Sequence, residues 1–273
     1  MVKRAFLEVP IIHKNSDESG RRQKPMFIAS GKIMLNVGNR IMNTYLYQIA
    51  GGYVMIDTGY EKHFNSCNKK MCKQTLSAKD IKYIFLTHVH DDHVGFINNM
   101  IKENKNLKVI MSPKGIETFR KGQNSFEGGC VGRLSYLFCL FMKMLGIGQH
   151  TFPPIKKEYE DNLIFISDEN KAELEEILNG TIVETPGHTD DSISLLTKDG
   201  YLFCGDAAMN GFPSKNNIII WIGNKEQYTK SWEKIISLNP NKIYPAHGNP
   251  FNVVKLKKNI KKLETVRLFP LLP

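Results

Sequence analysis

Short hydrophobic runs separated by polar residues recur along most of the chain and predict many strands with helices between them. Strands are predicted at 32–37, 43–49, 53–57, 83–87, 108–111, 163–167, 182–184, 192–197, 201–204, 218–221 and 242–244. Apolar residues spaced three and four apart predict helices near 94–103, 113–121, 171–179, 225–238 and 253–263. Gly51-Gly52 and Asp199-Gly200 lie between apolar runs and predict tight hairpins. This mixture indicates a layered α/β fold with much antiparallel strand pairing.

Length and composition restrict the class of protein. The 273 residues suffice for one large domain or two small ones. No linker, repeat or low-complexity tract divides them, so we expect a single domain over 1–273. With 41% hydrophobic and 23% charged residues, the composition excludes a disordered, collagen-like or integral membrane protein. The formal net charge of +10 favours anionic partners.

The cysteines and the N-terminal residues bear on the compartment. The five cysteines are odd in number and include no C-x-x-C pair, which fits a reducing compartment better than a disulfide framework. Glu8 and Pro10 interrupt the short apolar stretches at the N-terminus, which therefore lack the core of a signal peptide. We expect a cytoplasmic protein.

An apolar segment at 131–147 is the most individual part of the sequence. It is shorter than the roughly 20 apolar residues that span a bilayer, and it contains Arg133 and Lys143. We therefore expect a helix that does not cross a membrane. Apolar residues surround most of that helix, which leaves three interpretations open: packing in the core, a lid over an apolar substrate, or docking on anionic lipid.

The segment Thr87–His93 carries the densest group of metal-ligating residue types. His88 and His90 are separated by one residue, so both rings point to the same side of an extended backbone. Asp92 and His93 follow in the turn that opens the next predicted helix. Three imidazoles and a carboxylate supply nitrogen and oxygen donors suited to zinc and related metals. The sequence predicts a metal site here rather than a solvated polar turn.

Three further motifs place a polar residue in a sharp turn after a predicted strand. They are ETPGHTDDS around His188, FCGDAAM around Asp206 and YPAHGNP around His247. Ligands gather at strand ends in α/β proteins, so we expect these side chains to join the first group. The remaining histidines, His13, His63 and His150, are expected to be ordinary surface residues.

Together these motifs resemble those of the metallo-β-lactamase-fold hydrolases, over about residues 30–250. The resemblance implies a four-layer αββα sandwich with its metals at one edge, between the sheets. It implies one metal bound by His88, His90 and His188, a second bound by Asp92, His93 and His247, and Asp206 bridging both. The V-M-I-D-T-G segment matches the family's first motif, so Asp57 is expected to orient a ligand, with a simple turn residue as the alternative. In this family the interval 122–160 commonly forms a lid.

The resemblance also implies a chemistry. Two divalent ions, Zn²⁺ first and Fe, Mn or Co as alternatives, would share one water and hold it as a bridging hydroxide. Asp92 is expected to be the catalytic proton handler. Asp206 at the bridging position points to thioesterases, lactonases and phosphodiesterases rather than zinc β-lactamases. Met209 stands where acyl-homoserine lactonases have a Tyr, which argues against that subgroup.

The expected function is therefore hydrolysis of an ester, thioester or lactone with an apolar acyl part. The alternatives are a phosphodiesterase acting on a nucleotide, nucleic acid or phospholipid, and a non-catalytic metal-dependent binding or sensing protein. The expected partner is a small-molecule substrate. Nucleic acid is not expected, because a solvated helix face also explains the basic run at 255–267. Peripheral membrane contact through 131–147 and the oligomeric state stay open.

Overall fold

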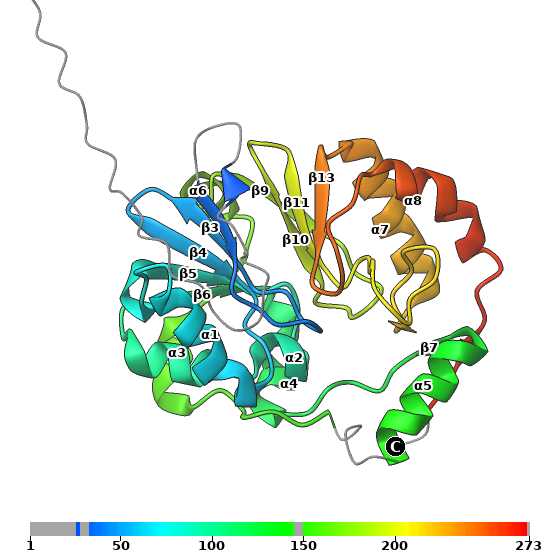
Figure 1. Cartoon of the computed structure of the whole chain (residues 1–273), viewed down its shortest axis with the longest axis horizontal. Coiled ribbons are helices and arrows are strands. Elements are labelled where there is room, and N and C mark those ends of the chain that lie inside the picture. Colours follow the sequence, from blue (N-terminus) through cyan, green and yellow to red (C-terminus); the bar gives the residue numbers. More distant parts are fainter. Residues whose placement is uncertain (1–25, 28–32, 145–149, 272–273) are drawn as a thin grey trace, which may run out of the picture.

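Two β-sheets pack face to face, and helices cover the outer face of each sheet (Figure 1). The computed structural model describes residues 26–27, 33–144 and 150–271. Helices α1, α3 and α4 lie beside one sheet, while α7 and α8 lie beside the other (Figure 1). The predicted four-layer αββα sandwich is confirmed.

The first sheet has seven strands in the order β1-β2-β3-β4-β5-β6-β8. They are β1 (Met26–Phe27), β2 (Ile33–Asn36), β3 (Tyr45–Ile49), β4 (Gly52–Ile56), β5 (Ile81–Phe85), β6 (Lys108–Met111) and β8 (Leu163–Phe165). The first four pair antiparallel and the last three add in parallel. The predicted hairpin at Gly51-Gly52 is shifted by one residue, because Gly52 already pairs with Ile49 and Gly51 takes the left-handed turn position at φ 75°.

The second sheet has four strands in the order β13-β11-β10-β9. They are β9 (Gly180–Glu184), β10 (Ile193–Thr197), β11 (Tyr201–Gly205) and β13 (Lys242–Pro245). The β10–β11 hairpin turns at Gly200, with φ 80°, as its sequence predicts. Strand β13 pairs in parallel with β11, so the chain must cross over between them, and α7 (Lys225–Leu238) makes that crossover.

A small third sheet has the order β12-β7-β14. Its strands are β7 (Gly129–Val131), β12 (Trp221–Ile222) and β14 (Leu268–Phe269), and α5 (Gly132–Met144) follows β7 directly. The strand predicted at 218–221 is wrong except at its last residue. Strands of two or three residues show no hydrophobic period, and pairing between distant segments creates them.

The remaining helices are α1 (Phe64–Cys72), α2 (Asp91–Val94), α3 (Ile97–Glu103), α4 (Ile116–Lys121), α6 (Lys171–Ile177) and α8 (Val254–Asn259). Short 3₁₀ turns lie at Glu61–His63, Ala78–Asp80, Pro113–Gly115, Lys157–Asn162 and Ile260–Leu263. The helix predicted at 94–103 is in fact α2 and α3, two separate helices. Helix α1 was not predicted, because it buries only Cys67 and Met71 and its apolar stripe is narrow. None of the described helices is both long and apolar enough to span a bilayer.

Alternating strand residues serve two different cores. In β4, Met55 faces the helices of the first sheet, while Val54 and Ile56 face the second sheet. The layer between the sheets is rich in aromatic rings, and the centroids of Tyr45 and Phe203 lie 5.4 Å apart. This packed layer gives the loops at its edge a rigid base.

Candidate metal centre

The predicted site residues come from four loops that meet at one edge of the two sheets. The segment after β5 carries Thr87–His93, with Asp92 and His93 in the short helix α2, and the loop between β9 and β10 carries His188. Asp206 follows β11 and His247 follows β13. All seven predicted ligands therefore lie at strand ends, and the structure brings them into three overlapping groups. Within each group, one donor atom per residue lies within 4.8 Å of the others.

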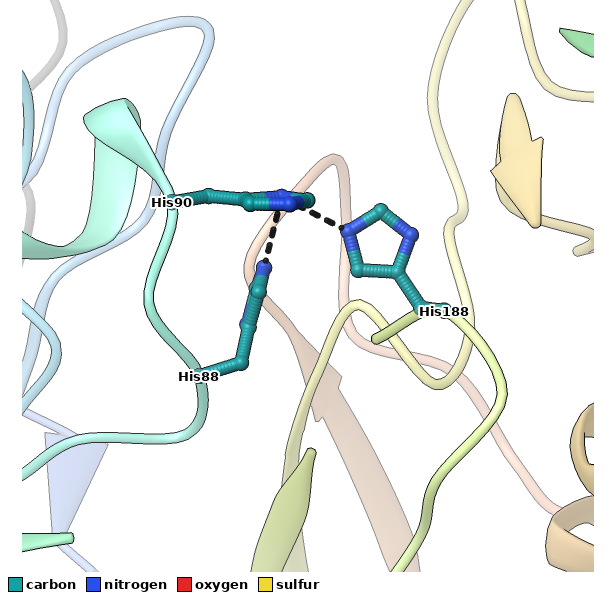
Figure 2. A group of neighbouring side chains, drawn as sticks. All are labelled: His88, His90 and His188. Atoms are coloured by element: carbon teal, nitrogen blue, oxygen red, sulfur yellow. Dashed lines mark hydrogen bonds between the residues drawn. The ribbon is translucent and has the colours of Figure 1, made fainter. Parts of the chain in front are cut away.

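His88, His90 and His188 form the first group, and Figure 2 shows their rings pointing toward one another from two loops. His90 Nδ1 lies 3.2 Å from His88 Nε2 and 3.0 Å from His188 Nε2. Nitrogens that bind one tetrahedral zinc at about 2.0–2.1 Å are about 3.3 Å apart. The three nitrogens therefore fit a single metal ion.

Asp92, His93 and His247 form the second group. His247 Nε2 lies 3.1 Å from one Asp92 oxygen, and His93 Nε2 lies 3.7 Å from the other. Asp206 stands between the groups, because its two oxygens lie 3.4 Å from His188 Nε2 and 3.5 Å from His247 Nε2. His93 Nε2 and Asp206 Oδ1 are buried without a hydrogen-bond partner among the described residues. Buried polar atoms of this kind need a partner, and a metal ion between them would provide it.

A second contact fixes the rings whose Nε2 atoms face the centre. Asp57, predicted to orient a ligand, lies 2.9 Å from His93 Nδ1 and accepts hydrogen bonds from the Thr87 backbone N–H and hydroxyl. The carbonyl oxygens of Trp221 and Ile41 lie 2.8 Å from His188 Nδ1 and 2.7 Å from His247 Nδ1. These contacts select the tautomer that leaves Nε2 free to bind a metal.

The two groups differ in charge. Burial, together with neighbouring imidazoles, lowers the pKa of His88, His90 and His188, so these rings are neutral near pH 7. Burial also opposes protonation of His247, but the Asp206 and Asp92 carboxylates outweigh it and raise its pKa to about 9.

The carboxylates respond in the opposite sense. Burial alone would raise the pKa of Asp206, but His247 and His93 outweigh it and hold the value at about 2. The pKa of Asp92 is held below its usual range against burial in the same way, by His93 and His247. The second group is thus a cluster of anionic oxygens that attracts cations, either protons or metal ions.

Some residues at the site were not predicted. Asp191 is buried, and one of its oxygens accepts a hydrogen bond from the backbone N–H of Val89, between His88 and His90, at 2.9 Å. Asn124 and Asp91 exchange two hydrogen bonds of 2.9 Å, which attach the chain after α4 to the metal motif. These contacts join residues 33 and 102 positions apart, so no local pattern signals them.

The other histidines have different outcomes. His150 was expected to be an ordinary surface residue; its side chain is 43% exposed, as expected, but it also contacts the metal motif. Its Nδ1 lies 3.4 Å from Asp91 Oδ2, and that contact raises its pKa. His63 is partly exposed and contacts Asn39, which agrees with the expectation, while His13 lies outside the described residues.

Helix α5 is not a core helix. Leu137, Phe141 and Met144 are 60%, 57% and 80% exposed, and Ser135 is the buried residue of the helix. The core interpretation of 131–147 is therefore wrong for its described part, and 145–147 lie outside the described residues. The lid and lipid interpretations remain.

The four layers and the His/Asp cluster define the class of metallo-hydrolase folds. A profile of the Metallo-beta-lactamase superfamily matches residues 37–247, so the chain belongs to that superfamily. A Drosophila melanogaster protein called beta-lactamase-like protein 2 homolog is 26% identical over 209 residues, which make up 76% of this chain and 58% of the fly protein. The chain thus spans little more than half of that relative.

Two further proteins extend the comparison. The probable metallo-hydrolase YflN of Bacillus subtilis is 24% identical over 246 residues, covering 82% of this chain and 87% of YflN. The solved structure of TTHA1623 in a di-iron-bound form matches with a TM-score of 0.57 at 18% identity, covering 82% of this chain and 96% of that one. The likeness to TTHA1623 shows a shared fold.

Proposed function

We propose that the chain is a hydrolase that uses two divalent metal ions, Zn²⁺ first, to cleave an ester, thioester or lactone with an apolar acyl part. The observation that carries this proposal is the position of Asp206, whose carboxylate lies near ring nitrogens of both groups: 3.4 Å from His188 Nε2, 3.8 Å from His93 Nε2 and 3.5 Å from His247 Nε2. A carboxylate between two dications offsets their repulsion. The di-iron form of the structural neighbour TTHA1623 supports two metals in this fold.

The residues divide the work as follows. One ion would be held by His88, His90 and His188, and the second by Asp92, His93 and His247. Asp206 would bind both ions. Asp57 would orient the His93 ring. When bound, two such ions supply a water of lowered pKa and polarise the oxygen of the scissile group. We assign Asp92 the catalytic role, because its depressed pKa keeps it ionised and able to orient the attacking water through a hydrogen bond.

The exposed apolar surface of helix α5 supports the part of the proposal that concerns an apolar acyl group. The Phe138 ring lies 6.0 Å from Phe212, which is itself 80% exposed, so apolar surface continues from α5 onto the loop after β11. Asn124 joins the chain leading to α5 to the metal motif through Asp91. We propose one domain in which the interval 122–160 forms a lid over an apolar acyl group. A cytoplasmic location and peripheral membrane contact through 131–147 stay predictions.

Two chromogenic substrates test the class of bond. The protein, with its metal content measured, is assayed on p-nitrophenyl acyl esters and on bis-p-nitrophenyl phosphate. Faster turnover of the esters supports the proposal, while turnover of the phosphate diester alone would favour the phosphodiesterase alternative. Turnover of neither substrate class at full metal occupancy would favour the non-catalytic binding or sensing protein.

A further inference from the structure

A cavity of about 660 Å³ lies away from the predicted metal ligands, between the start of α5 and two segments distant in sequence. Residues 131–135 line it, together with five residues of the loop 213–219 and six residues of the C-terminal stretch 262–269. None of the seven predicted ligands lines it. We call it the basic cavity.

The charge of the basic cavity is of one sign. Arg133, Lys215, Lys262 and Arg267 line it, and no Asp or Glu is among the lining residues. Within the described ranges, none of these four side chains forms an ion pair with a carboxylate. Four cations around one concavity concentrate positive potential and attract an anion.

Helix α5 adds donors to the same space. Its first four residues, Gly132 to Ser135, line the cavity. Backbone N–H groups in the first turn of a helix lack intrahelical partners, although that of Gly132 is already bonded to the Arg267 carbonyl. Ser135 is only 5% exposed and lines the cavity, yet its hydroxyl has no hydrogen-bond partner in the part of the chain that the structure describes. The hydroxyl oxygen itself is accessible from the cavity, so it can bond a ligand there.

The walls are held together before any ligand arrives. Lys262 Nζ donates to Asn216 Oδ1 at 2.7 Å, which joins the C-terminal stretch to the loop 213–219. The Gly132 backbone N–H donates to the Arg267 carbonyl at 3.1 Å, which joins α5 to the same stretch. Pre-organisation of this kind lowers the entropic cost of binding.

Part of the lining is apolar. Ile218 and Ile219 are buried in the wall. Leu134 also lines the cavity, is 43% exposed and belongs to the exposed apolar face of α5. The cavity therefore combines donors for an anion with a surface for a hydrocarbon group. We propose that the basic cavity binds the phosphate of an anionic amphiphile, a ligand site that goes beyond the hydrolase function.

Calorimetric titration with hexyl phosphate tests the site. We expect the double variant Arg133→Gln/Lys262→Gln to bind at least about tenfold more weakly, because it removes two charge-assisted hydrogen bonds. The matched control Lys79→Gln/Lys102→Gln removes the same charge from exposed lysines outside the cavity lining and should bind as the parent does. Should the first variant fail to fold in thermal unfolding, Lys215→Gln/Arg267→Gln tests the other walls.

Two controls separate the basic cavity from the metal centre and from the net charge of the chain. Asp206→Asn alters the proposed metal centre and should leave hexyl phosphate binding intact. Loss of binding in Asp206→Asn, with retention in both cavity variants, would overturn the proposal and assign the ligand to the metals. Equal weakening by the control pair Lys79→Gln/Lys102→Gln would also overturn it, since net charge alone would then account for binding.

Vesicles distinguish a membrane lipid from a soluble ligand. Co-sedimentation with phosphatidylcholine vesicles containing phosphatidic acid, abolished by Arg133→Gln/Lys262→Gln, would identify the phosphate as that of a bilayer lipid. Binding of hexyl phosphate without co-sedimentation would identify a soluble amphiphile. Binding of neither probe by the parent protein would contradict the proposal.

Discussion

The metal centre and the region around α5 are built in opposite ways. At the metal centre, the predicted ligands are buried or nearly so, and a second hydrogen bond fixes the ring nitrogens that face away from the centre. Around α5, three large apolar side chains are more than half exposed, and two- and three-residue strands attach the helix to the domain. Rigid positioning suits the chemistry common to a family, whereas an exposed apolar helix suits selection of a substrate or surface.

The largest expected effect lies at the centre of the metal site. Asp206→Asn keeps the side-chain shape but removes the charge between the two proposed ions. We expect a weakened second metal and a loss of kcat/KM of at least about a hundredfold, since even outer contacts of metal ligands cost 10–100-fold. Metal analysis and steady-state kinetics measure both quantities. Full occupancy with a near-normal rate would reduce Asp206 to a turn residue.

The next effect tests the outer contacts. Asp57→Asn removes the carboxylate that orients His93, and we expect about 10–100-fold lower activity or metal affinity. Asp161→Asn, at an exposed position, is the matched control and should behave as the parent. Equal behaviour of the two variants would show that Asp57 does not support a ligand.

The two histidine groups should also respond differently to pH. His247 has a pKa of about 9, so it is protonated near pH 7, and a metal that binds its ring must displace that proton. Against burial, Asp57 and Asp92 raise the pKa of His93 as well, so a second proton can be displaced. Affinity at the second position should therefore rise at least about tenfold per pH unit up to about pH 9. The first group has lowered pKa values and is already neutral, so its affinity should be nearly constant between about pH 6 and 8. Metal titrations across this range measure both, and parallel pH profiles would contradict the difference.

The smallest effect belongs to α5. If the helix covers an apolar acyl chain, each added methylene should raise kcat/KM about three- to fourfold until the pocket fills. Phe138→Ser/Phe141→Ser should flatten this dependence without changing metal content. Val254→Ser, at an exposed position on α8, is the control. An unchanged chain-length profile in the double variant would remove α5 from the substrate site.

The same contrast explains what could be predicted from the sequence. Helix α7 matches its predicted bounds, because Asn224 caps its start through the Gln227 N–H and Asn239 ends it in a left-handed conformation. The seven candidate ligands could be proposed from the sequence because each lies in a short motif after a strand, and the structure brings their side chains together. Asp191 and His150 were missed, because their roles depend on contacts with Val89 and Asp91 from distant segments.

The exposure of the apolar side chains of α5 could not be predicted from the sequence either. The sequence pattern of an apolar helix is the same whether the helix is buried or exposed. Its exposure depends on where the rest of the chain packs. The candidate metal ligands thus lie in short local motifs that the sequence reveals. The exposure of α5 depends on tertiary contacts that the sequence does not reveal.

Metal stoichiometry tests the central claim most directly. Protein purified without chelator is analysed for its elements, before and after addition of Zn²⁺ and removal of the excess. Because six donor side chains form two groups on either side of the seventh, Asp206, we expect close to two metal ions per chain. A reproducible value of one that does not rise when metal is added would contradict it.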